Sequence, residues 1–149
     1  MKTLIAILIL LAFLQTTLLP INIVVIILLL RAYIKPDSTN LYLAFFFGIL
    51  VAFLSHQNLG FLSALYLSQV FVTHLLSKSP LSKNIFSVVP IIVVFSLILE
   101  FLTSVPFGQS PNFFPRVIIE GFFSLPIYLG LRLWEERFVV RSHIKLKMR

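Results

Sequence analysis

The chain reads Ile23-Val24-Val25-Ile26-Ile27-Leu28-Leu29-Leu30, an apolar run in which polar and apolar residues do not alternate. A strand of a membrane β-barrel alternates the two kinds of side chain, so this run does not fit one. A segment that is apolar on every side is instead typical of a buried or membrane-embedded helix. Comparable runs lie on both sides of it, separated by short polar or charged segments. The sequence therefore predicts an all-α fold.

The composition places these helices in a membrane. Hydrophobic residues make up 59% of the 149 positions and charged residues 11%, whereas soluble domains carry roughly a quarter charged residues. The mean hydropathy is +1.05. Cysteine is absent, which excludes disulfides and cysteine-based metal sites. We expect a polytopic membrane helical bundle whose net charge of +7 is balanced by anionic lipid rather than by nucleic acid.

Six apolar segments are candidate transmembrane helices, and the loops between them are short. They are expected at residues 3–19, 21–34, 40–55, 59–76, 85–105 and 116–134. Together they form a single transmembrane domain over residues 1–136, and residues 137–149 form a basic cytoplasmic tail. Because a transmembrane helix needs about 20 residues, the first two segments are short for the task.

The distribution of basic residues favours a cytoplasmic N-terminus and C-terminus. With six spans, eleven of the 12 Lys and Arg residues lie inside and Arg116 alone lies outside, as the positive-inside rule prefers. Five spans, with one long helix at the start, give ten inside and two outside, which does not exclude that alternative. The deciding feature is a polar set that one long helix would bury near mid-bilayer and a hairpin would place at a wet turn. This set comprises Gln15, Thr16, Thr17, Pro20 and Asn22.

Small residues recur every four positions in the third and fourth segments. The two stripes are Ala44, Gly48 and Ala52 in the third, and Gly60, Ala64 and Ser68 in the fourth. In lipid, small residues on one helix face let two backbones approach closely. The short connection between the segments makes them antiparallel neighbours, so we expect both stripes to meet in a tight hairpin. The alternative is that the spacing is coincidental, since small residues are common in membrane helices.

Two carboxylates fall within the apolar segments, Glu100 and Glu120, and a basic residue accompanies them. Arg116 precedes Glu120 by four positions and so shares its helix face, and Glu100 can reach the same Arg116 across the hairpin. An unpaired charge inside a membrane costs a few kcal/mol or more, which makes such residues functional candidates. We expect a structural clamp of three charges. Contact with a partner protein, and ion or proton transfer, stay open as alternatives.

Nothing in the sequence indicates an enzyme. His56, His74 and His143 belong to an outer loop, an inner helix end and the tail, so they do not converge on one metal. No Gly-rich phosphate loop and no Ser/His pairing of an intramembrane protease is present. Gln15 and Gln69 are expected to form hydrogen bonds between helices. We therefore expect no catalytic residues, no cofactor, no metal and no small-molecule substrate.

The tail is expected to contact anionic lipid. Its basic residues are Arg137, Arg141, Lys145, Lys147 and Arg149. Each can add on the order of 1 kcal/mol at an anionic surface, and Trp134 suits the aromatic belt at the membrane interface. Docking to a cytoplasmic protein is the alternative.

The order of polar, glycine and proline residues carries a family resemblance along most of the chain. The first helix ends at Gln15 near a proline, and the second apolar segment closes with Arg31-Ala32-Tyr33-Ile34-Lys35-Pro36. Gly48 is followed twelve residues later by Gly60, and the last helix runs from Glu120-Gly121 past a proline to a terminal Arg132. This arrangement resembles the MreD family, the small integral-membrane component of the bacterial rod-shape machinery.

The resemblance implies a non-enzymatic scaffold in the bacterial plasma membrane. Such a scaffold associates with the bitopic protein MreC and, through it, with the peptidoglycan polymerase and transpeptidase pair and the actin-like filament. One departure matters, because Ala52 stands where that family often has Asp, so no functional role is transferred there. The family is also similar to the substrate-binding subunits of energy-coupling-factor vitamin transporters. That similarity defines an alternative function, with a polar pocket drawn from Gln57, Asn58, Gln69, Glu100 and Glu120.

Overall fold

The computed structural model describes residues 2–18, 21–79, 87–104 and 113–135. Over these residues it contains six α-helices and no strand. They are α1 (Lys2–Thr17), α2 (Ile23–Ile34), α3 (Thr39–Leu54), α4 (Leu59–Ser77), α5 (Val88–Ser104) and α6 (Phe113–Trp134). The prediction of an all-α fold is confirmed. The predicted tail contacts of Arg137, Arg141, Lys145, Lys147 and Arg149 lie outside the described residues.

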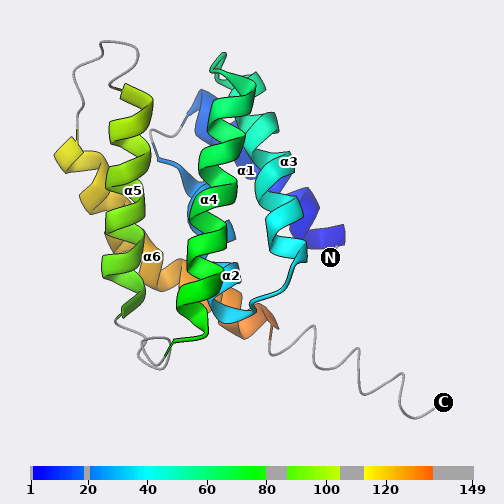
Figure 1. Cartoon of the computed structure of the whole chain (residues 1–149), viewed down its shortest axis with the longest axis vertical. Helices are drawn as coiled ribbons and strands as arrows, with labels where there is room; N and C mark the ends of the chain where they lie inside the picture. The colour runs from blue at the N-terminus through cyan, green and yellow to red at the C-terminus, as the bar shows by residue number, and fades with distance from the viewer. Residues whose placement is uncertain (1, 19–20, 80–86, 105–112, 136–149) are drawn as a thin grey trace.

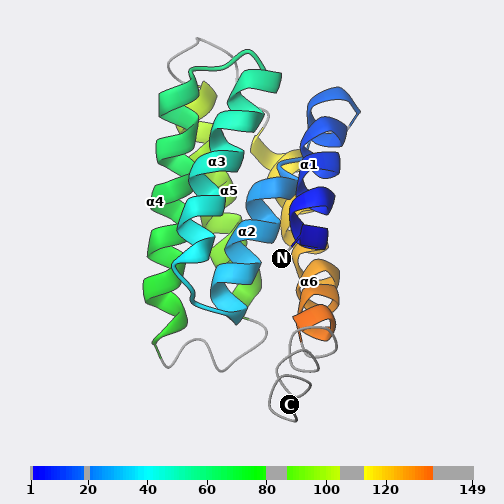
Figure 2. The same ribbon diagram turned by 90° about the vertical axis from the view of Figure 1, so that its right-hand side faces the viewer.

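The first apolar stretch forms two helices, because α1 ends at Thr17 and α2 begins at Ile23. The hydroxyl groups of Thr16 and Thr17 donate to backbone carbonyls one turn earlier, the latter to Phe13 at 2.8 Å. Such back-bonding weakens the regular helix pattern near its end. Figures 1 and 2 show α1 and α2 running in opposite directions. The expected break is therefore present in place of one long helix.

The short helix α2 occupies the centre of the bundle. Every residue from Val24 to Tyr33 is buried, and α2 contacts all five other helices. Its uniformly apolar sequence explains this position, since a helix without a polar face has no side to turn toward water. Twelve residues give a length of about 18 Å, well below the hydrocarbon thickness of about 30 Å. Figure 2 shows the other helices enclosing it.

The outside of the bundle also carries many large apolar side chains. Large exposed hydrophobic side chains occur on α1, α3, α4, α5 and α6, among them nine phenylalanines. These are Phe13, Phe45, Phe46, Phe53, Phe61, Phe71, Phe101, Phe122 and Phe123. Among the described residues, two helices are long and apolar enough to cross a membrane, Leu59–Ser77 and Pro115–Trp134, and four shorter apolar helices accompany them.

The α3 stripe lies in the α3–α4 interface, and Gly48 is its point of closest approach. Ala44 and Ala52 are fully buried. A Cβ atom placed on Gly48 would lie 2.5 Å from the Cα of Ser63 on α4. No side chain fits there, because the obstacle is backbone. The close contact thus requires glycine at this position.

The prediction for the α4 stripe is wrong. Gly60, Ala64 and Ser68 are exposed, and a Cβ on Gly60 would meet nothing within 4 Å. At 100° per residue the stripe lies on nearly the opposite side of α4 from its buried residues. Those residues are Leu62, Ser63, Tyr66, Gln69, Val70 and Thr73. The helix turns its polar groups toward the other helices, where Gln69 finds a hydrogen-bond partner, and the small stripe is left outside.

The connection between α2 and α3 is fixed by local hydrogen bonds. The side chain of Asn40 is buried and its Nδ2 donates to the carbonyl of Lys35 at 2.7 Å. The hydroxyl of Thr39 donates to Asp37 Oδ2 at 2.9 Å. Hydrogen bonds from the side chain and backbone of Thr39 lower the pKa of the Asp37 carboxyl below its usual value. The carboxylate stays charged at the start of α3, where the helix dipole favours it.

Candidate functional site

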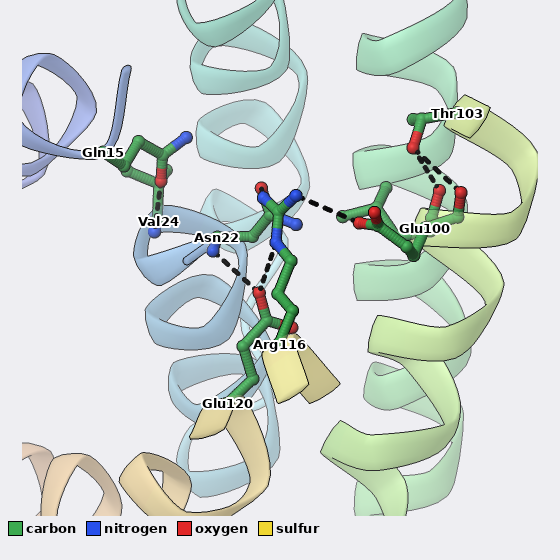
Figure 3. A network of polar contacts seen from close by, with 8 residues as sticks. Gln15, Asn22, Val24, Glu100, Thr103, Arg116 and Glu120 are labelled. Carbon is green, nitrogen blue, oxygen red and sulfur yellow. Dashed lines mark hydrogen bonds and ion pairs between the residues drawn. The ribbon is translucent and has the colours of Figure 1, made fainter. Parts of the chain in front are cut away.

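A cluster of three charged side chains joins α5 and α6 (Figure 3). Arg116, in the first turn of α6, places Nη1 3.1 Å from Glu100 Oε2 on α5. Its Nε lies 3.5 Å from Glu120 Oε1, one helical turn further on. The second distance marks an ion pair without hydrogen-bond geometry, since Nε has no hydrogen-bond partner. The structure thus brings together all three residues expected to form the charged clamp.

The cluster also holds the beginning of α2, through Asn22. The backbone N–H of Asn22 donates to Glu120 Oε1 at 2.8 Å. In return, Arg116 Nη2 donates to the side-chain Oδ1 of Asn22 at 3.0 Å. Figure 3 shows Asn22, Arg116 and Glu120 in direct contact, with Glu100 on the far side of the guanidinium group. The charges of α5 and α6 therefore fix the turn between α1 and α2.

Glutamine 15 of α1 completes the capping of α2. Gln15 Oε1 accepts a hydrogen bond from the backbone N–H of Val24 at 3.0 Å. The N-cap residue Asn22 makes no side-chain capping bond of its own. The first N–H groups of any helix lack internal partners, and leaving them unsatisfied away from water is costly. Here two side chains from other helices supply the acceptors, and the carboxylate also suits the positive end of the helix dipole.

The cluster contains two negatively charged side chains and one positively charged side chain. Glu120 is 1% exposed, and the side chains of Glu100 and Arg116 are 13% and 31% exposed. Two carboxylates face one guanidinium, so the ion pairs leave an excess of one when all three are ionised. Because the pairs are shielded from water, this excess is screened less than a surface charge would be.

A polar pocket of about 170 Å³ opens beside the cluster. It is lined by Gln15, Thr16, Asn22, Val51, Ser55, Gln57, Leu62, Tyr66, Leu99, Glu100, Thr103 and Arg116. Of the five residues expected to form an uptake pocket, Gln57 and Glu100 line it. Asn58, Gln69 and Glu120 do not. Glu120 instead sits behind Arg116 on the α2 side of the cluster.

Both glutamines form bonds between helices, as expected. Gln69 Nε2 of α4 donates to the backbone carbonyl of Phe95 on α5 at 3.0 Å, in a buried position. Gln15 and Asn22 were expected at a wet turn, and this expectation is wrong in part. Both are hydrogen-bonded to other helices and are half-buried.

Sequence reasoning missed Tyr66, which is fully buried and lines the pocket. A signal was present in its spacing. Tyr66, Gln69 and Thr73 stand at positions i, i+3 and i+7 of α4 and therefore share one face. Polar groups on one side of an apolar helix indicate the side that faces protein.

The other end of the bundle carries a second ion pair that the sequence did not reveal. Arg31, in the last turn of α2, lies with Nε 3.6 Å from Glu135 Oε1, after α6. Nearby, the hydroxyls of Tyr33 and Ser87 share a hydrogen bond of 2.6 Å. Both ends of α2 are thus tied to α6 by charge. Within the described residues no group of three or more His, Cys, Asp or Glu side chains is placed to hold a metal.

No protein-family model, no curated protein and no solved structure matches this chain.

Proposed function

We propose that the chain is a multi-pass protein of the bacterial plasma membrane with six membrane-embedded helices and both termini in the cytoplasm. The support is its apolar circumference, where large exposed side chains surround a core that is itself apolar. A water-soluble domain rarely exposes contiguous apolar surface on this scale. Helix α2 is too short to span alone, but it is enclosed by other helices and so does not need to match the bilayer thickness.

The charge distribution supports the orientation. The C-terminal ends of α2, α4 and α6 lie at the same end of the bundle (Figure 1). That end holds Arg31, Lys35, Lys78 and Arg132, which the positive-inside rule assigns to the cytoplasm. The opposite end holds Arg116, paired with two carboxylates. The basic tail after Trp134 then contacts anionic lipid from the inner side.

Within that membrane, the protein acts as a non-enzymatic scaffold of cell-wall elongation that maintains rod shape. The observation that carries this proposal is an apolar groove of about 770 Å³ between α5 and α6. Among the described residues its walls are entirely apolar: Val93, Leu97, Ile98, Phe101, Leu102, Val117 and Ile118. Such a groove suits the single transmembrane helix of a bitopic partner, and the resemblance to the MreD family indicates an MreC-like protein and, through it, the cell-wall synthases.

The test is depletion followed by microscopy, combined with a groove variant. Loss of the protein should convert rods to spheres. Ile98→Trp, which fills the groove, should reduce co-purification of the MreC-like partner and fail to restore rod shape. Phe71→Trp, at a similarly exposed position on α4, is the matched control and should restore it. Rods that persist after depletion would refute the scaffold function, and equal behaviour of the two variants would refute the groove as the docking site.

The alternative is a substrate-binding subunit of an energy-coupling-factor-type transporter. The polar pocket beside Arg116 favours it, because such a subunit needs a polar site near the outer leaflet. The pocket, at about 170 Å³, is smaller than the roughly 300–1,000 Å³ typical of sites for drug-sized ligands. A vitamin that co-purifies with the protein, and growth that depends on its uptake, would favour this alternative over the scaffold.

A further inference from the structure

The polar pocket lies at an end of the bundle that has a surplus of negative charge. Between Lys83 and Arg132 the sequence contains three charged residues, Glu100, Arg116 and Glu120. Arg116 pairs with both carboxylates, so one negative charge has no basic counterpart there. A buried uncompensated charge is costly, and a cation, or a proton on one carboxyl group, removes that cost.

The hydroxyl groups around the pocket present acceptors rather than donors. Thr16 Oγ1 donates to the Ala12 carbonyl at 3.0 Å and Ser55 Oγ donates to the Val51 carbonyl at 2.7 Å. Thr103 Oγ1 likewise donates to the Leu99 carbonyl at 2.8 Å. Each hydroxyl has a single proton, and here it is used within the residue's own helix, which leaves the oxygen lone pairs for a ligand.

Tyr66 adds a buried hydroxyl group. Its side chain is fully buried and lines the pocket. Its hydroxyl makes no hydrogen bond of regular geometry among the described residues, and the side chain of Gln15, which also lines the pocket, is a polar neighbour. Buried polar atoms in proteins are nearly always hydrogen-bonded, so an unsatisfied one that faces a cavity points to a ligand or to ordered water. The Tyr66 hydroxyl can accept a hydrogen bond from a cation as well as donate one.

We propose that this pocket binds the ammonium group of a small primary amine. Three N–H donors on a compact positive charge match a carboxylate and several hydroxyl acceptors spread around the walls. The pocket volume of about 170 Å³ is several times the roughly 30 Å³ that one water molecule occupies. A bare alkali metal ion would leave most of that space empty, whereas a short aminoalcohol fits. The amine is either free or the headgroup of phosphatidylethanolamine, and the chemistry at the pocket is the same for both.

The proposal does not depend on the scaffold function, and its failure would leave that function untouched. The experiment uses the full-length protein in a detergent free of amine lipid, at pH 8, where histidines are generally neutral and primary amines cationic. Thermal unfolding is followed while ethanolamine hydrochloride is titrated. A saturable rise in the midpoint is expected. Choline chloride, which has no N–H donor, and sodium chloride at equal ionic strength should give much smaller shifts.

Three variants locate the site. Glu100→Gln removes the surplus charge and should weaken ethanolamine binding at least about tenfold. Tyr66→Phe removes one hydroxyl at unchanged shape and should weaken it about three- to tenfold. Asp37→Asn removes a carboxylate before α3, at the other end of the bundle, and should leave the affinity unchanged. If Glu100→Gln does not fold, the affinity of Tyr66→Phe for ethanolamine tests the site.

The source of the amine is resolved with vesicles. One preparation contains phosphatidylglycerol alone and the other an equal mixture with phosphatidylethanolamine. Stabilisation by the mixture that is reduced in Tyr66→Phe, without an effect of free ethanolamine, would identify the lipid headgroup. An effect of free ethanolamine in the phosphatidylglycerol vesicles would identify a soluble amine. The proposal is overturned if neither stabilises the wild-type protein, if sodium acts equally well, or if both pocket variants respond like the wild type.

Discussion

Glu120 accepts a hydrogen bond from the backbone N–H of Asn22 at 2.8 Å, across 98 positions of sequence. The contact joins the last helix of the bundle to the N-cap residue of its central helix. A helix that begins in the interior must find acceptors for its first N–H groups, and α2 has none of its own at the N-cap. The carboxylate of Glu120 and the amide of Gln15 provide them. The charged cluster is therefore a cap for α2 as well as a clamp between α5 and α6.

Removing the carboxylate should destabilise the bundle strongly. Glu120→Ala leaves the Asn22 N–H without its acceptor in a partly buried position and removes one of the two carboxylates paired with Arg116. We expect a loss of about 2–4 kcal/mol in the free energy of unfolding, measured by denaturation in mixed SDS and detergent micelles. Glu120→Gln keeps an oxygen for the Asn22 N–H and should lose less than Glu120→Ala. Equal stabilities of wild type and Glu120→Ala would contradict the capping role.

Gly48 should not tolerate even the smallest side chain. Gly48→Ala places a methyl group against the backbone of Ser63, so α3 and α4 must separate, at a cost of about 1–3 kcal/mol. Gly60→Ala is the matched control, because its Cβ meets nothing within 4 Å, and the higher helix propensity of alanine can add up to about 1 kcal/mol. Unfolding midpoints in detergent measure both. If the two variants lost stability equally, the asymmetry between the stripes would be refuted.

The bond between Gln69 and the Phe95 carbonyl should contribute little. Hydrogen bonds between membrane helices average about 0.6 kcal/mol, and Gln69 Oε1 is buried without a partner. Gln69→Met has a similar shape and removes the bond together with the unsatisfied oxygen. We expect a change within about 1 kcal/mol in either direction. A loss comparable with that of Glu120→Ala in the same denaturation assay would show that the α4–α5 contact depends on this bond.

The sequence predicted the helices well and their orientation less well. Uncharged apolar runs are a strong signal, so all six elements lie close to their expected residues. Charge pairing followed from spacing, since Arg116 and Glu120 are one turn apart. The rotation of α4 about its own axis could not be predicted from the sequence, because small residues occur on packed and on outward helix faces with equal local propensity. The polar side chains of Tyr66, Gln69 and Thr73 mark the face that turns inward, and the hydrogen-bond partner of Gln69 lies on another helix.

The central position of α2 could not be predicted from the sequence either, because all the apolar segments have similar local patterns.

The central position of α2 can be tested with the same substitution at two sites. Leu28 of α2 is fully buried, whereas Leu10 of α1 is 61% exposed. Leu28→Ala opens a cavity among helices and should cost about 2–5 kcal/mol. Leu10→Ala shortens an exposed side chain without opening an enclosed cavity and should cost less than about 1 kcal/mol. The free energies of unfolding of both variants in the same micelles provide the measurement. A Leu10→Ala variant as unstable as Leu28→Ala would contradict the exposed position of this face of α1.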